Sequence, residues 1–162
     1  MTEQSLHEGL EPQIRNAVRA VILRDGAVLM QKKRSETKGE WYTLPGGGQN
    51  AGETLEASLI RECEEELGVR IKVGELLTIA DTFKPRETAV PSTRHVIEIY
   101  YACQVPAHYH AHSGDHPDKH QVDVVWLPIG RLAGFSFQPN DLVQLLPRII
   151  TDGLRGYLGE IG

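Results

Sequence analysis

The apolar residues of this chain fall into short runs rich in β-branched side chains, and into two stretches with helical spacing. Residues 15–33, RNAVRAVILRDGAVLMQKK, contain two such short runs separated by Asp25-Gly26. An Asp-Gly pair between two β-rich runs is a strong signal for a tight hairpin turn. Further strands are predicted over residues 41–48, which run into glycines, and over residues 69–83, 94–105 and 122–128.

Two stretches predict helices instead. Residues 53–68, ETLEASLIRECEEELG, repeat apolar positions with the helical period and end at Gly68, a residue type that commonly caps a helix. Residues 139–153 predict a second helix, which Pro147 ends or kinks. Strands interleaved with one strong helix indicate an α/β or α+β domain with a mixed sheet.

The length of the chain indicates one domain. It has 162 residues, enough for a core of its own. Residues 1–13 are predicted to be a flexible leader. No repeat or linker divides residues 14–162, which we expect to form a single domain as a monomer or a homodimer.

Charge and hydropathy exclude some partners. A net charge of −5 argues against a module that binds duplex nucleic acid, because such modules are usually basic. No apolar run approaches the ~20 residues that span a bilayer, and the N-terminus lacks the layout of a signal peptide, so no membrane partner is expected. Cys63 and Cys103 form no CxxC pair, and a reducing cytoplasm is the expected location.

Four glutamates crowd into five positions of the first predicted helix, at 62, 64, 65 and 66. Like charges at i,i+3 and i,i+4 spacing each cost a helix roughly 0.2–0.5 kcal/mol. Successive helical residues lie about 100° apart, so Glu66 falls near about +40° and Glu65 near about −60° from Glu62. Three carboxylates therefore share one stripe of the helix, and Glu64 points away from it.

The apolar stripe of this helix borders the acidic one, because Leu59, Cys63 and Leu67 fall between about +60° and +140° on the same wheel. Carboxylates beside a core are partly desolvated, and their repulsion grows as the dielectric falls. Two interpretations are open. The face is simply solvated and acidic, or it binds a hard divalent cation such as Mg²⁺, which takes carboxylates together with substrate phosphates.

The helix also completes a longer motif, GGQNAGETLEASLIRECEEELGV at residues 47–69. It reads Gly47, five residues, Glu53, seven residues, Arg61-Glu62, an apolar position, one residue, Glu65-Glu66, one residue, Gly68 and an apolar residue. This pattern resembles the Nudix box of the MutT-like Nudix hydrolases at every fixed position. The one oddity is Cys63 in place of an aliphatic residue, and buried thiols behave as small hydrophobes.

The resemblance covers roughly residues 14–150 and implies an α/β/α sandwich with a mixed sheet, in which the box forms a loop–helix–loop. It also implies hydrolysis of a nucleoside diphosphate linked to another group, with Mg²⁺ or Mn²⁺ as the cofactor. The implied metal ligands are Glu62, Glu65, Glu66 and the carbonyl of Gly46, with Glu53 in support.

The remaining box residues have implied roles in catalysis and substrate binding. Arg61 orients a glutamate, for which an ordinary i,i+4 surface pair is the alternative. Gly47 and Gly48 let the backbone approach the ion and the phosphates closely. Outside the box, Lys84 and Arg86 lie in the predicted loop after residues 69–83 and are candidates to meet phosphates, with solvated loop charge as the alternative.

Several residues are candidates for the general base. Glu98 is a lone acidic residue on the apolar strand 94–105 and is our prediction for this role. A glutamate at the rim of a half-exposed sheet is the alternative interpretation. Asp115, Asp118 and Glu65 are competing candidates.

Histidines alternate at positions 108, 110 and 112, so on a strand they would share one face and could bind zinc. Because residues 106–121 also hold Gly, Pro and Asp, a flexible polar loop is the preferred interpretation. 

The sequence leaves the nucleotide open. Pro85 lies sixteen residues past Val69, as is common in ADP-ribose-cleaving members of the Nudix family. Nucleoside triphosphates and nucleotide sugars are equally compatible. The alternative from another class is a Nudix domain that senses a nucleotide without cleaving it, although such domains often lose box residues.

Overall fold

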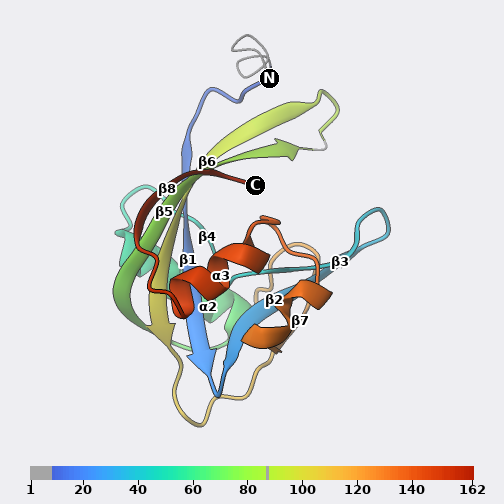
Figure 1. Cartoon of the computed structure of the whole chain (residues 1–162). Coiled ribbons are helices and arrows are strands. Elements are labelled where there is room, and N and C mark those ends of the chain that lie inside the picture. The colour runs from blue at the N-terminus through green and yellow to red at the C-terminus, as the bar shows by residue number, and fades with distance from the viewer. Residues whose placement is uncertain (1–8, 87) are drawn as a thin grey trace.

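The computed structural model describes residues 9–86 and 88–162 (Figure 1). The elements are β1 (Arg15–Arg24), β2 (Ala27–Ser35), β3 (Gly39–Thr43), β4 (Gly46–Gly48), α2 (Leu55–Leu67), β5 (Lys72–Arg86), β6 (Ser92–Gln104), β7 (Gln121–Pro128), the 3-10 helix η1 (Ile129–Gly134), α3 (Leu142–Ile150) and β8 (Gly156–Ile161). All of the predicted strands and both predicted helices are present.

The strands form a mixed sheet in the order β3-β2-β1-β6-β5-β8. β1 runs parallel to β6 and β5 parallel to β8, whereas β1–β2, β2–β3, β2–β7 and β5–β6 are antiparallel. The predicted hairpin at Asp25-Gly26 is confirmed. Both residues have positive φ, 49° and 75°, which is what a two-residue hairpin turn of the I′ type requires.

β1 changes partner along its length. Leu23 and Arg24 pair with β2, whereas Ala17, Val18 and Arg19 pair with β4. The glycines of β4 therefore take the place beside β1 that β2 has left. This insertion brings the start of the glutamate motif against the middle of the sheet.

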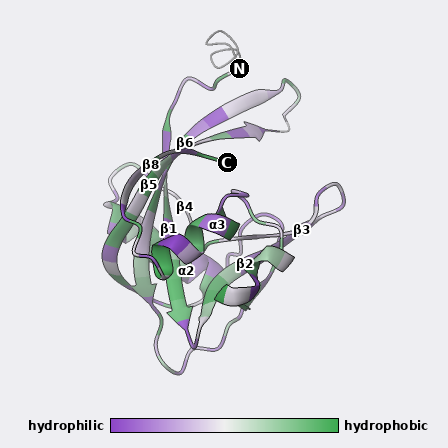
Figure 2. Cartoon of the chain, in the orientation of Figure 1, coloured by the Kyte–Doolittle hydropathy of each residue, from purple (hydrophilic) through white to green (hydrophobic). Residues whose placement is uncertain are grey.

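The two helices cover opposite faces of the sheet. Along β1 the side chains alternate, so Val18, Ala20 and Ile22 join the core under α2, and Val21 joins the core under α3. The α/β/α sandwich predicted from the sequence is thereby confirmed. Figure 2 shows apolar colouring on β1 and β2 and a more hydrophilic far end on the β5–β6 hairpin.

α2 has both of its predicted ends capped. The Thr54 side chain accepts a hydrogen bond from the backbone N–H of Ala57, and Gly68 adopts the left-handed conformation with φ 67°. The apolar stripe faces the core as expected, because Leu59, Cys63 and Leu67 are fully buried.

Residues 106–121 form the predicted loop, and this loop caps the last carbonyls of α2. The backbone N–H groups of Gly114 and His116 donate to the carbonyls of Glu66 and Glu65 at 2.9 and 3.1 Å. The Tyr109 hydroxyl donates to the Leu67 carbonyl at 2.9 Å. These carbonyls would otherwise lack partners at a helix end, so the loop holds the end of α2 in place.

Two features differ from the sequence-based expectation. β8 was not predicted, because its short segment is interrupted by Gly156 and Gly159, both at positive φ. Pro147 lies inside α3, which continues to Ile150, so the proline does not end this helix. Residues 1–8 of the predicted leader lie outside the described residues, whereas Gly9 and Glu11 hydrogen-bond to Thr93 of β6.

No helix in the described part of the chain combines the length and the hydropathy needed to cross a membrane.

Gly114 provides a test of the loop's capping role. A Cβ added at this position would lie 2.4 Å from the carbonyl oxygen of Glu65 and 2.7 Å from the backbone nitrogen of Gly68. We expect Gly114→Ala to lower the free energy of unfolding by about 1–3 kcal/mol, measured by urea denaturation. The matched control is Gly134→Ala, where the added Cβ meets no heavy atom within 4 Å. Equal stabilities of the two variants would contradict the capping role.

Candidate active site

Arg61 lies at the centre of the acidic cluster. Its Nε and Nη2 donate to both carboxylate oxygens of Glu53, at 2.7 and 3.0 Å. Its Nη1 contacts Glu62 at 3.1 Å and Glu65 at 3.3 Å, and its Nη2 also donates to the Gly48 carbonyl at 3.1 Å. Because a guanidinium is planar and rigid, this one residue fixes three carboxylates and the glycine strand relative to one another.

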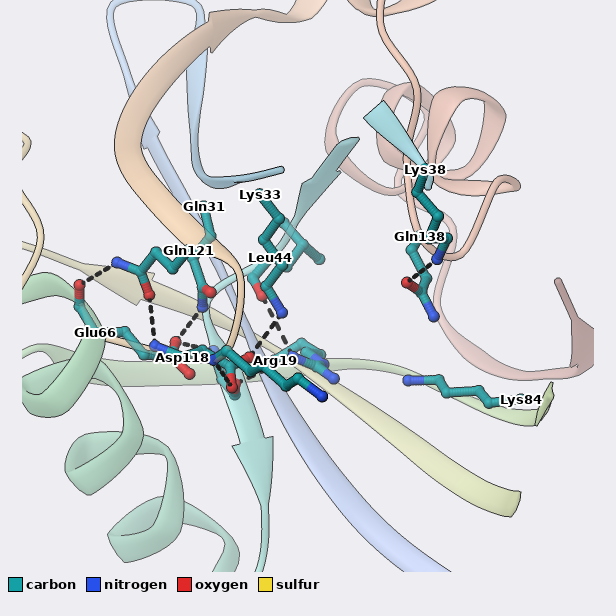
Figure 3. A network of polar contacts seen from close by, with 12 residues as sticks. Arg19, Gln31, Lys33, Lys38, Leu44, Glu66, Lys84, Asp118, Gln121 and Gln138 are labelled. Carbon is teal, nitrogen blue, oxygen red and sulfur yellow. Dashed lines mark hydrogen bonds and ion pairs between the residues drawn. The ribbon is translucent and has the colours of Figure 1, made fainter. Parts of the chain in front are cut away.

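Glu66 is the buried member of the cluster, with 2% of its surface exposed. Its carboxylate accepts hydrogen bonds from the Gly46 N–H, at 2.9 Å, and from the Gln31 side chain. Burial raises the pKa of Glu66 well above its ordinary value, although the Gly46 N–H opposes this shift. Figure 3 shows Glu66, Gln31 and Gln121 meeting beside the end of α2. A carboxylate in this setting is stabilised by a nearby cation.

The glycines before α2 are required by close contacts. Gly46 has φ 138°, and a Cβ there would lie 1.9 Å from the Val18 carbonyl oxygen. A Cβ at Gly47 would lie 2.5 Å from the carboxylate carbon of Glu62. Any side chain at position 47 would therefore displace one of the predicted metal ligands.

The donor set fits a hard divalent cation. It offers the carboxylates of Glu62, Glu65 and Glu66 together with the Gly46 carbonyl, and oxygen atoms are the ligands that Mg²⁺ and Mn²⁺ prefer. Within the described residues, no group of three or more acidic, histidine or cysteine side chains is arranged to hold a metal ion as it stands. The carboxylates of Glu62 and Glu65 contact Arg61 instead, so binding a cation would require them to turn toward it.

Glu98 is buried on β6, with its side chain 1% exposed, and Arg19 links it to the Gly46 carbonyl of the cluster. It pairs with Arg19 of β1 at 3.0 Å and with Lys84 of β5 at 2.6 Å. Burial opposes its ionisation, but the charges of Arg19 and Lys84 prevail and lower the pKa of Glu98 to about 2. These contacts disfavour the base role predicted for Glu98, since so weakly basic a carboxylate accepts a proton poorly.

The other candidate bases differ in exposure and contacts. Glu65 is the most exposed of the three clustered carboxylates, at 38% of its side chain. Asp118 pairs with Lys33 at 2.7 Å (Figure 3). Burial opposes the ionisation of Asp118, but the charge of Lys33 prevails and lowers its pKa. Asp115 is exposed on the loop.

Arg86 and Lys84 are both engaged in ion pairs. Arg86 contacts Glu11 at 2.6 Å, in the segment before β1, and its side chain is 38% exposed. Burial and the charge of Arg19 lower the pKa of Lys84, and the charge of Glu98 opposes this shift. Neither residue is therefore a freely solvated loop charge, which was the alternative interpretation from the sequence.

The sequence-based reasoning missed two polar residues beneath the cluster. Arg19 donates through Nη1 to the Gly46 carbonyl at 3.1 Å, and Gln31, which donates to Glu66, is fully buried. Both residues interrupt otherwise apolar stretches of β1 and β2. A charged or amide side chain in such a stretch was the available signal, because a buried polar group needs a partner.

Comparison with known proteins identifies the family of the chain. The NUDIX domain model matches residues 13–149, and the chain belongs to this family. A nucleoside triphosphatase NudI of Enterobacter sp. is 35% identical over 91 residues, which cover 53% of this chain and 64% of that protein. An ADP-ribose pyrophosphatase of Methanocaldococcus jannaschii is 36% identical over 63 residues, covering 39% of this chain and 37% of that protein. The matches thus span less than two thirds of each relative.

Solved structures agree on the fold. A NUDIX hydrolase from Nitrosomonas europaea superposes with a TM-score of 0.65 at 19% identity, covering 89% of this chain and 93% of that one.

The Glu98 ion pairs predict a pH-dependent stability. Glu98→Gln leaves Arg19 and Lys84 without their shared counter-ion, and we expect it to lower the free energy of unfolding at pH 7 by about 3 kcal/mol. Because the pKa of Glu98 is lowered to about 2, its stabilisation is complete above its ordinary pKa and is lost as the pH falls toward 2. The gap between wild type and variant in urea denaturation should therefore narrow below about pH 4.5. A gap that stays constant down to pH 2.5 would contradict this account.

Proposed function

We propose that this domain is a divalent-cation-dependent pyrophosphohydrolase acting on a nucleoside diphosphate linked to another group. The observation that carries the proposal is the convergence of Glu53, Glu62 and Glu65 on Arg61, beside the buried Glu66. Crowded carboxylates destabilise a fold by mutual repulsion unless positive charge offsets them. Arg61 supplies one such positive charge. A divalent cation, which would also bind the diphosphate of the substrate, would supply more.

Each residue of the cluster has a part in this proposal. Glu62, Glu65, Glu66 and the Gly46 carbonyl would hold Mg²⁺ or Mn²⁺, and Glu53 would keep Arg61 in place. The cation, when bound, would neutralise phosphate charge and lower the pKa of a coordinated water. Gly47 and Gly48 would leave room for the substrate phosphates to approach the backbone.

Glu65 is the proposed general base. Of the three carboxylates on the acidic stripe, Glu62, Glu65 and Glu66, it is the most exposed, and its contact with Arg61 holds it at the edge of the cluster. A base must lie within reach of the attacking water, directly or through one further water. Arg86 is proposed to contact substrate phosphates, which would require it to exchange its pair with Glu11.

The proposed partner is a small nucleotide. The relatives include proteins named as a nucleoside triphosphatase and an ADP-ribose pyrophosphatase. Nucleoside triphosphates and ADP-ribose are therefore both proposed as substrate classes. A cytoplasmic location is also proposed, on the ground that Cys63 and Cys103 are both buried free thiols.

A nucleotide panel tests the proposal most directly. The purified chain is incubated with nucleoside triphosphates, ADP-ribose and nucleotide sugars, with Mg²⁺, with Mn²⁺ or with EDTA. We expect turnover of at least one of these substrates with a divalent cation, and loss of that turnover in EDTA, measured as released phosphate or pyrophosphate and nucleoside monophosphate. Tight nucleotide binding without turnover of any of them would favour the sensing alternative instead.

Neutral substitutions within α2 test the ligand assignment. Glu62→Gln and Glu66→Gln should each lower kcat by roughly 10²–10³-fold or more, because each removes a charged ligand that stabilises the transition state. Glu64→Gln is the matched control, since Glu64 lies on the exposed side of the same helix. Circular dichroism verifies that all three variants fold. If Glu62→Gln or Glu66→Gln keeps near wild-type kcat, that residue is not a ligand.

A further inference from the structure

A basic cleft lies beside Gly48, outside the cluster of glutamates. It has a volume of about 150 Å³ and is formed mainly by β1, β5 and β6. Its lining includes Arg15, Ala17, Arg19, Gly48, Lys84 and Arg94.

Small residues create the cleft and long cationic residues surround it. Ala17 lies between Arg15 and Arg19 on the same face of β1, because side chains two positions apart share a face. On one side Ala17 pairs with Gly48 of β4. Two neighbouring positions without a long side chain therefore leave a hollow that the flanking guanidinium groups border.

The cleft carries an excess of positive charge. Arg19 and Lys84 share a single counter-ion, the buried Glu98, and Figure 3 shows Lys84 extending toward Arg19. In the same way Arg94 shares the Glu11 carboxylate with Arg86. 

Arg15 makes no ion pair with any residue that the structure describes. Four cationic side chains line the cleft, and the two carboxylates that pair with them, Glu98 and Glu11, leave an excess of two positive charges. The whole chain has a net charge of −5, so this local excess is opposite in sign to the rest of the protein. Among the described residues, no acidic side chain lines the cleft itself.

The cleft adjoins the proposed catalytic cluster at two residues, Gly48 and Arg19, and Arg19 donates to the Gly46 carbonyl at 3.1 Å. The Gly48 carbonyl accepts a hydrogen bond from Arg61 at 3.1 Å. A Cβ at Gly48 would lie 3.3 Å from Nη2 of Arg15, so the Arg15 guanidinium packs against the same glycine. A group bound among the cleft's cations would therefore lie next to the site where the pyrophosphate is proposed to be cleaved.

We propose that this cleft binds a third phosphate of the substrate, beyond the two phosphates that the cleaved bond joins. Guanidinium groups match the geometry of phosphate oxygens, and an excess of cations around a small hollow favours a dianion. The inference rests on the proposed hydrolase function and narrows its substrate class. A nucleoside triphosphate has a terminal phosphate to place here, whereas ADP-ribose has a neutral ribose at that end.

Binding of inorganic phosphate to the full chain in EDTA tests the cleft without relying on activity. We expect saturable binding by NMR titration of the backbone amides, with shifts centred on Ala17 and Gly48. Arg15→Gln should raise the Kd for phosphate about tenfold or more, because a charge-assisted hydrogen bond is lost. Ala17→Leu, which fills the hollow, should raise this Kd by at least the same factor.

The matched control is Arg70→Gln, because Arg70 is an arginine that is 74% exposed and lies outside the cleft. Its phosphate affinity should equal that of wild type. Arg15 is exposed, so its substitution is not expected to impair folding even if Ala17→Leu does. No saturable phosphate binding by wild type, or an unchanged Kd in Arg15→Gln, would overturn the proposal.

Kinetics then distinguish a substrate phosphate from free phosphate. With ATP and ADP-ribose as a pair that shares its base, Arg15→Gln should raise KM for ATP about tenfold and leave KM for ADP-ribose unchanged. If phosphate binds in the cleft but neither KM changes, the cleft takes free phosphate and the substrate assignment is overturned. If wild type hydrolyses no nucleotide of the full panel, the hydrolase proposal fails and the substrate assignment fails with it, while the titration still decides whether the cleft binds phosphate.

Discussion

The buried carboxylate of Glu66 is the contact on which the arrangement of the site depends. It joins the end of α2 to the Gly46 N–H and to Gln31 of β2, at the place where β1 has exchanged β2 for β4. A charged carboxylate in such a position is costly, which is why burial raises its pKa. The fold offsets part of this cost with N–H donors and with the nearby charge of Arg19, and the proposed cation would offset more.

Helix α2 contributes to both the core and the candidate site, because its apolar stripe and its acidic stripe lie next to each other. Leu59, Cys63 and Leu67 are buried against the sheet, and the carboxylates lie along the edge of that buried surface. Their positions depend on the helix ends. Thr54 caps the beginning of α2, and the loop of residues 106–121 binds its last carbonyls, so the carboxylates are held by backbone contacts as well as by packing.

Much of the fold was predictable from local patterns. The Asp25-Gly26 turn, the α2 helix with Gly68 at its end and the long β5–β6 strands all follow from residue types and their spacing. β8 was not predicted, since its stability comes from parallel pairing with β5, a strand distant in sequence. Pro147 was predicted to end or kink α3, but the helix is amphipathic and its buried leucines hold it together through Ile150.

The acidic half of the site was predictable from the sequence, because the glutamates and Arg61 belong to one contiguous motif. The partners of Glu98 were not predictable. Arg19 and Lys84 come from strands on either side of β6, and only the strand order brings them to one carboxylate. In this arrangement Glu98 is the shared counter-ion of two cations, and the base role assigned to it from the sequence stays a prediction that these contacts disfavour.

The central claim is that the α2 carboxylates and the glycine strand hold a divalent cation together. Paramagnetic broadening of the backbone amide resonances by substoichiometric Mn²⁺ locates such an ion directly. The account predicts that Gly46, Gly47, Glu62 and Glu66 broaden first, while the resonances of β8 remain sharp. Broadening centred on the histidines of residues 106–121, or spread evenly over the acidic surface, would contradict it.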